Sequence, residues 1–209
     1  YMSQVMALYR QVYRTENQWT FLVNGTARAG IEACLGSLIA PGDKVLVPRF
    51  GRFGYLLEEI CRRVGGVVVT RDQEWGQVFD LADIAASIAE HKPKVVAMVH
   101  GDTSTTMAQP LEGLGAVCRE HDALLYVDAT ATLGGMPVEV DAWQLDAVSA
   151  GFQKCMSGPP GSSPVTIGER AVAVILERKH IEGGIQPDGY VATNGPAISS
   201  NYLDLGMLM

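Results

Sequence analysis

The sequence predicts an α/β fold, a three-layer α/β/α domain whose central sheet is mostly parallel. Short apolar runs alternate with longer segments in which apolar residues recur at helical spacing. The short runs are apolar throughout, which is typical of parallel strands buried on both faces. Polar residues follow several runs, where open α/β sheets bind their ligands. These residues are Asn24, Thr26, His100, Asp102, Thr103, Asp128 and Lys154.

Residues 1–70 predict three strands and the helices around them. The chain opens in a helix-like segment with one apolar face, formed by Met2, Val5, Met6, Tyr9, Val12 and Tyr13. Apolar runs predict strands at 19–23, 44–47 and 66–70. Helical spacing predicts helices at 28–39 and 53–64, and a turn at Pro41-Gly42-Asp43 precedes the second strand.

Residues 80–182 continue the alternation. Helices are expected at 80–91, where Asp80 is a plausible N-cap, and at 111–121. Strands are expected at 94–99, 123–127 and 146–150. The stretch 157–164 is rich in turn residues and is interpreted as a loop. Residues 171–179 begin with a strand-like run and could form either a strand or a helix.

The domain organisation follows from composition along the chain. We expect one large domain over residues 1–182, incomplete at its N-terminal side. Residues 183–209 are expected to form a linker and the start of a smaller C-terminal domain, because 183–201 is rich in Gly, Pro and Asn. The helix-like segments at both ends lack start and stop signals, so we expect a piece of a longer polypeptide.

Composition narrows the class of function. A net charge of −7 disfavours nucleic acid as a partner. No apolar run approaches the ~18 residues of a membrane span, and no signal peptide is visible, so a cytoplasmic protein is expected. The four cysteines form no CxxC pair and are expected to be reduced thiols. The four histidines lack metal-ligand spacing, so no metal site is expected.

Lys154 and Asp128 suggest the chemistry of the site. Each follows a strand-like run, so both are expected at neighbouring strand ends. Pyridoxal phosphate needs an amine for its aldehyde and an anion for its ring nitrogen. Lysine becomes nucleophilic when burial or nearby positive charge lowers its pKa. The alternatives are a solvated surface lysine and a capping aspartate, or an aspartate that binds Mg²⁺ or a ribose.

Three further segments could contribute to such a site. Gly25-Thr26-Ala27-Arg28 lies between a strand and a helix, where backbone N–H groups could hold a phosphate. It matches neither a GxGxxG fingerprint nor a P-loop, which disfavours nucleotide binding. Phe53 could stack on a planar ring, or be a core aromatic. Thr103 could donate to a ring oxygen, or be only a turn residue.

Together these residues resemble the class V aminotransferases of the fold-type-I pyridoxal-phosphate superfamily. The resemblance runs over nearly the whole chain and keeps the order of its motifs. Several stretches resemble more closely the ureidoglycine–glyoxylate aminotransferases of purine breakdown: 25–33, 51–57, 96–101 and 199–205. Arg28 and Phe53 favour that group over the alanine/serine–glyoxylate enzymes, which carry a small residue plus histidine and a tryptophan at the matching places.

The resemblance implies a role for each matching residue. Lys154 would be the catalytic Schiff-base lysine and Asp128 the partner of the ring nitrogen. Phe53 would stack on one face of the ring and Thr130 would pack on the other, with Thr103 at the phenolic oxygen. The phosphate would be held by Thr26, Ala27, Arg28 and Gln153.

The resemblance also implies an activity and partners. The expected enzyme is an aminotransferase with glyoxylate as amino acceptor and (S)-ureidoglycine as donor, acting as a homodimer with shared active sites. The alternatives are an alanine– or serine–glyoxylate aminotransferase and a binding module without turnover. A cysteine desulfurase is disfavoured, because no cysteine is expected in an exposed loop and Phe53 replaces the histidine of those enzymes.

The sequence departs from the family pattern in three places. A Gly/Pro-rich segment that closes over the substrate is absent, and so is the C-terminal domain that carries an arginine for the substrate carboxylate. A tyrosine and a threonine that reach the phosphate of the neighbouring subunit would follow Met209. Thr106 stands where many relatives have glycine, which we expect to be tolerated.

Overall fold

A computed structural model describes the whole of residues 1–209. Its centre is a seven-stranded sheet with the order β1-β9-β8-β7-β4-β2-β3. These strands are β1 Trp19–Asn24, β2 Lys44–Arg49, β3 Val67–Asp72, β4 Val95–Val99, β7 Leu124–Asp128, β8 Ala147–Ser149 and β9 Ser162–Ile167. A separate two-stranded ribbon pairs β5 Gly101–Asp102 with β6 Met107–Ala108.

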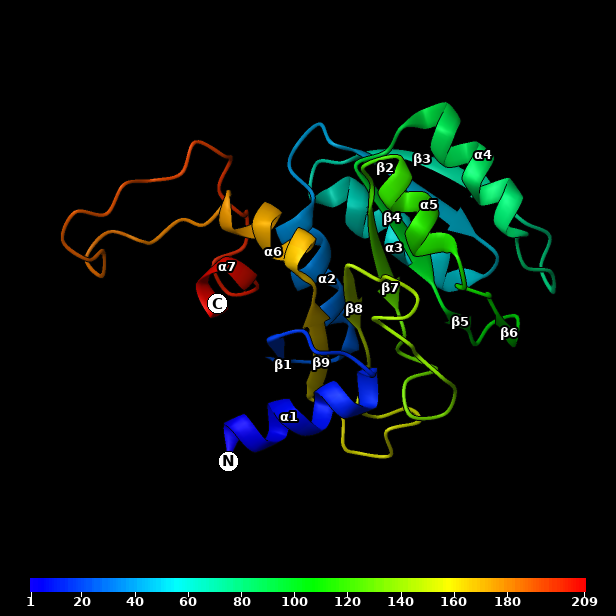
Figure 1. The fold of residues 1–209 in the computed structure, drawn as a ribbon, viewed down its shortest axis with the longest axis horizontal. Helices are drawn as coiled ribbons and strands as arrows, with labels where there is room; N and C mark the ends of the chain where they lie inside the picture. The colour runs from blue at the N-terminus through cyan, green and yellow to red at the C-terminus, as the bar shows by residue number, and fades with distance from the viewer.

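Helices cover both faces of the sheet, as the sequence predicts (Figure 1). They are α1 Met2–Tyr13, α2 Ala27–Leu38, α3 Arg52–Arg63, α4 Leu81–His91, α5 Leu114–Glu120, α6 Glu169–Leu176 and α7 Leu205–Leu208. Helices α2 and α3 pack against each other, and α4 and α5 form a second pair. The three-layer α/β/α arrangement is confirmed.

The sheet is mostly parallel, also as predicted. Strands β3, β2, β4, β7 and β8 pair in parallel, and only β9 runs antiparallel to both of its neighbours. Every residue of β4 and of β7 is buried. This burial on both faces explains why these strands are apolar throughout.

One segment differs from the expectation, and one that was left open is resolved. Residues 162–164, interpreted as part of a loop, begin strand β9. The carbonyl of Pro164 accepts hydrogen bonds from the N–H of Ala150 at 2.9 Å and the hydroxyl of Tyr13 at 2.8 Å. Ala150 and Tyr13 lie outside this segment of the sequence. The local content of turn residues therefore could not predict that the segment forms a strand. The ambiguous run beginning at Val172 lies in helix α6.

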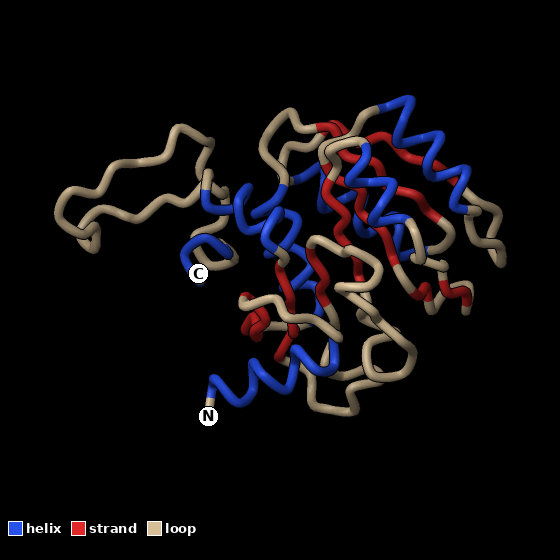
Figure 2. The backbone as a smooth tube through the Cα atoms, viewed as in Figure 1, coloured by secondary structure: helices blue, strands red, loops and turns tan.

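The C-terminal segment extends away after α6 and then returns to pack against α2 and α6. Residues 177–204 contain no helix or strand, and Figure 2 shows part of this segment extending away from the body of the molecule. Ile198 and Leu205 join the hydrophobic core after the excursion. The division into a large domain and a linker at residue 182 stays a prediction. None of the helices combines the length and apolar character that crossing a bilayer requires.

Candidate active site

All nine predicted site residues line one cavity of about 270 Å³. The cavity lies where the carboxyl end of β7 meets the starts of α2 and α3, the edge at which α/β sheets bind ligands. The predicted residues are Thr26, Ala27, Arg28, Phe53, Thr103, Asp128, Thr130, Gln153 and Lys154. Ile31, Leu56, Gly101 and Ala131 complete the lining.

Lys154 and Asp128 follow adjacent parallel strands. Asp128 ends β7 and pairs in register with Ser149, the last residue of β8, and Lys154 lies in the turn that follows. Gly151 lets this turn approach closely, since a Cβ there would lie 2.8 Å from the methyl of Thr130. Lys154 itself is exposed in this chain.

Asp128 is a buried carboxylate at the floor of the cavity. Its Oδ1 accepts a hydrogen bond from the backbone N–H of Thr130 at 2.9 Å. Burial raises the pKa of Asp128, and the hydrogen bonding from Thr130 opposes this effect. A cation next to this carboxylate would offset the cost of burying its charge. Asp128 can therefore serve as the anionic partner of a cationic ring.

The starts of α2 and α3 differ in the availability of their backbone N–H groups. The N–H groups of Ala27 and Arg28 have no acceptor in the chain, and the first turn of α2 holds no acidic residue. In α3 the N–H of Arg52 donates to Ser104 Oγ at 2.9 Å and that of Phe53 donates to Asp102 Oδ2 at 2.8 Å. Only α2 thus offers free N–H groups to an anion at the cavity.

Asp102 and Ser104 are site-supporting residues that the sequence analysis did not single out by role. Asp102 is buried, and its Oδ1 also accepts from the N–H and hydroxyl of Ser104, at 3.0 and 2.7 Å. A Cβ at Gly51 would lie 2.3 Å from the Asp102 carboxyl carbon, so this approach requires glycine. An acidic residue shortly after the buried strand β4 is the signal that the sequence offers. The partner of this residue, the start of α3, cannot be predicted from spacing.

His100 supports the loop that carries Thr130. Its Nδ1 lies 2.8 Å from Thr132 Oγ1, and its ring meets the ring of Trp143 edge-on. Burial lowers the pKa of His100, which favours the neutral ring. Thr130 Oγ1 is buried and has no hydrogen-bond partner in the chain. Because buried polar atoms are nearly always paired, this hydroxyl is available to a ligand.

The expectation that no cysteine lies in an exposed loop is wrong. Cys155, in the turn directly after Lys154, is exposed, and its Sγ lies 3.3 Å from the carbonyl of Ala131. The presence of a cysteine does not by itself indicate whether the residue lies in an exposed turn or in a buried helix. The other three cysteines, Cys34, Cys61 and Cys118, are buried free thiols. No group of three or more His, Cys, Asp or Glu side chains is arranged to hold a metal ion.

Comparison with known proteins decides the family. The family model described as aminotransferase class-V matches residues 2–188. The chain belongs to the class V aminotransferase family. The resemblance of the motifs is confirmed, and the family match extends from α1 through the loop after α6.

Curated relatives within this family include glyoxylate-dependent enzymes. The (S)-ureidoglycine–glyoxylate transaminase of Bacillus subtilis is 49% identical over 209 residues, which cover 99% of this chain and 50% of the relative. The alanine–glyoxylate aminotransferase of Rattus norvegicus is 33% identical over 178 residues, 85% of this chain and 43% of the relative. The chain therefore spans about half the length of the curated relatives it matches.

Solved structures share the fold. The ureidoglycine–glyoxylate aminotransferase of Bacillus subtilis matches with a TM-score of 0.90 and 47% identity, over 99% of this chain and 49% of that chain. The alanine–glyoxylate aminotransferase of Nostoc sp. matches with a TM-score of 0.89 and 36% identity, over 99% of this chain and 51% of that chain. Both likenesses support the three-layer fold and the family.

Proposed function

We propose that this chain forms the pyridoxal-phosphate site of an aminotransferase, with Lys154 as the residue that binds the cofactor covalently. The observation that carries the proposal is the presence of an amine, a carboxylate and an aromatic ring around one cavity, from Lys154, Asp128 and Phe53. Two free N–H groups at the start of α2 suit a phosphate. The unpartnered hydroxyl of Thr130 is a further polar group for a ligand.

Pyridoxal phosphate, when bound, supplies an aldehyde for amines and a ring that accepts the electron pair released at the substrate carbon. Lys154 Nζ would provide the amine for the aldehyde and would accept the proton released at the donor's α-carbon. Asp128 would accept a hydrogen bond from the ring nitrogen and keep it protonated. Phe53 and Thr130 would orient the ring from its two faces.

The remaining residues orient the cofactor. The backbone N–H groups of Ala27 and Arg28 would donate to the phosphate, whose charge the α2 dipole would stabilise. The hydroxyl of Thr26 and the amide of Gln153 would add hydrogen bonds to the same group. Thr103 would donate to the phenolic oxygen of the ring. Every one of these residues lines the same cavity.

For the whole protein we propose glyoxylate as amino acceptor and (S)-ureidoglycine as donor. The 49% identity to the Bacillus subtilis transaminase over almost the entire chain supports this choice, against 33% for the rat alanine–glyoxylate enzyme. By the family resemblance, Arg28 and Phe53 favour it as well, and both line the cavity. An alanine– or serine–glyoxylate aminotransferase is the second candidate, and it would use the same cofactor residues.

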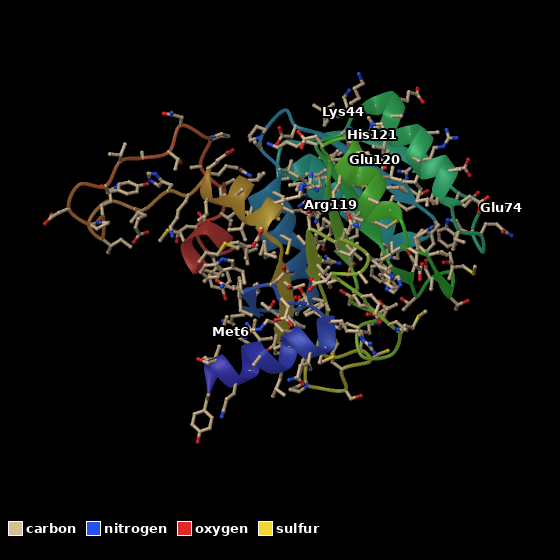
Figure 3. All side chains as sticks on the ribbon, in the orientation of Figure 1. Met6, Lys44, Glu74, Arg119, Glu120 and His121 are labelled. Atoms are coloured by element: carbon tan, nitrogen blue, oxygen red, sulfur yellow. The ribbon has the colours of Figure 1, made fainter.

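Covalent labelling tests the cofactor site. We expect pyridoxal phosphate, fixed by borohydride reduction and located by mass spectrometry, on Lys154. Lys154→Ala should lose the label, because no other amine lines the cavity. Lys44→Ala is the matched control, because Lys44 is exposed at the amino end of β2, whereas the cavity lies at the carboxyl ends of the strands. Figure 3 labels Lys44. Labelling of Lys154→Ala at the wild-type level would refute the assignment.

A donor panel tests the substrate. The loaded protein is mixed with (S)-ureidoglycine, alanine or serine, and loss of the bound cofactor's visible absorption is followed before glyoxylate is added. We expect the largest kcat/KM for ureidoglycine. A larger value for alanine or serine would move the assignment to the second candidate. Cofactor binding without reaction of any donor would favour a binding module without turnover.

A further inference from the structure

The start of α3 depends on a residue that lies outside the helix. Gly51, which precedes α3, has no side chain that could cap it, and no side-chain cap bond is formed there. Instead, Asp102 accepts the N–H of Phe53 at 2.8 Å across 49 residues of sequence. Ser104, from the same loop, accepts the N–H of Arg52. The orientation of Phe53 is therefore set by the loop that follows β4.

Asp102 is a buried carboxylate without a cationic partner. Its residue is 1% exposed, and no lysine or arginine forms an ion pair with it. Its charge is compensated by three hydrogen bonds, one from Phe53 and two from Ser104. The α3 dipole adds to this, since α3 has twelve residues and no acidic residue in its first turn. Removing the carboxylate would leave the N–H of Phe53 without its acceptor and would free Ser104, which accepts the N–H of Arg52, from two of its hydrogen bonds.

The loop that contains Asp102 also forms part of the cavity wall. Thr103, the next residue, lines the cavity, and so does Gly101, the residue before. The backbone of Asp102 is held in the ribbon by pairing with Met107. Asp102 thereby connects the wall formed by the loop to the wall formed by Phe53. Phe53 is proposed to stack on one face of the ring and Thr103 to contact its phenolic oxygen, so the relative position of these two walls affects how the ring is held.

We propose that Asp102 is a positioning residue that holds Phe53 against the cofactor ring, acting through the first turn of α3. This inference rests on the proposed cofactor site, which it deepens. Asp102 does not touch the reacting atoms. Its effect is on cofactor affinity, because a loose Phe53 must be ordered when the ring binds.

The test compares two buried carboxylates that both accept backbone hydrogen bonds. Asp102→Ala removes the cap, and Asp102→Asn keeps an acceptor oxygen without the charge. Asp146→Asn is the matched control: Asp146 is buried, accepts the N–H of Leu125 at 2.8 Å and lies outside the cavity lining. Amide exchange of the peptide containing Phe53 is measured without cofactor, and the dissociation constant of pyridoxal phosphate is measured by dialysis.

We expect Asp102→Ala to raise amide exchange at the start of α3 and the cofactor dissociation constant roughly tenfold or more. Asp102→Asn should fall between Asp102→Ala and wild type. Asp146→Asn should lower the melting temperature and leave both readouts near wild type. If Asp102→Ala does not fold, Asp102→Asn and Ser104→Ala give the same comparison, because each weakens the cap.

Two results would overturn the proposal. One is wild-type exchange and affinity in the Asp102 variants, and the other is an equal loss of affinity in Asp146→Asn, which would indicate general destabilisation. Failure of the wild-type protein to bind pyridoxal phosphate would instead refute the proposed function. In that case the exchange measurement, made without cofactor, still decides whether Asp102 holds the start of α3.

Discussion

Asp128 shows how one residue's surroundings set its chemistry. It ends a fully buried strand, and burial raises its pKa although Thr130 donates to it. The ionised form of Asp128 is therefore an unfavourable buried charge in the protein without cofactor. A protonated ring nitrogen would compensate that charge, so cofactor binding and stability should be linked through this one carboxylate.

The pH dependence of stability tests this link. Because the folded pKa of Asp128 is raised, its contribution to stability is fully present below about pH 4, the unfolded value, and is lost as pH rises through the folded pKa. In urea unfolding without cofactor, Asp128→Asn should therefore reduce the fall in stability above about pH 4. Asp188→Asn, at an exposed carboxylate, is the control. An unchanged pH profile in Asp128→Asn would contradict the assigned burial cost.

Thr106 occupies a strained backbone position. Its φ is 60°, in the left-handed region that β-branched residues rarely adopt, and many relatives carry glycine there by the resemblance. The substitution is tolerated by the fold, but at a cost. Thr106→Gly should stabilise the protein by about 1 kcal/mol. A urea titration that gives equal or lower stability for the glycine variant would show that the strain is compensated elsewhere.

Helix α2 is the element that connects the cavity to the rest of the fold. Its N-terminal N–H groups are free at the cavity, and its C-terminal end is capped from a distance. The guanidinium of Arg178 donates from Nη1 to the carbonyls of Gly36, Ser37 and Ile39 at 3.0, 2.9 and 2.8 Å. A cation at this end is favourable for the helix dipole. Arg178 also donates to Pro196, which holds the returning C-terminal segment.

Removal of Arg178 should be costly for this element. Arg178→Met leaves three buried carbonyls without their donor, so we expect a loss of about 2–4 kcal/mol in urea unfolding. Arg63→Met is the matched control, since it deletes an exposed guanidinium that pairs only with Glu59. That change should cost less than about 0.5 kcal/mol. Equal effects of the two variants would contradict the capping role.

At the scale of the whole molecule, apolar side chains of α1 and the lysine at the cavity are exposed. Met2 and Leu8 of α1 are exposed, although α1 has an apolar face, and only Tyr9 and Tyr13 are buried there. Met6 lies half-buried on the same helix (Figure 3). Lys154 is exposed at the cavity. These features agree with the homodimer that we expect, in which a partner subunit covers the site.

Sedimentation of the purified protein measures its oligomeric state and so tests the expected homodimer. The purified protein should sediment as a dimer, because exposed apolar side chains on α1 favour burial against a partner. Leu8→Glu, in the middle of the exposed face, should shift the population toward monomer. Gln11→Glu is the control at an exposed polar position of the same helix. A wild-type protein that remains monomeric at high concentration would refute the homodimer.

The sequence by itself determined the order of most elements, the mostly parallel sheet and the residues around the cavity. Strands that are apolar throughout predicted the sheet, and polar residues after their carboxyl ends predicted Thr26, Thr103, Asp128 and Lys154 as site residues. Thr130 and Gln153 were expected from the family resemblance and not from this pattern. Lys154 and Asp128 could be placed together because adjacent parallel strands end at the same edge of the sheet.

Only the tertiary structure decided how distant segments complete each other. Strand β9 contains Ser and Pro, and its pairing partners in β1 lie far earlier in the chain. Asp102 caps a helix 49 residues away, and Arg178 caps the end of α2 from 142 residues away. Periodicity and turn signals report local preference, whereas these hydrogen bonds form only when the packed core brings the segments together. The exposure of Cys155 likewise depends on the tertiary arrangement of its turn, which local sequence patterns do not report.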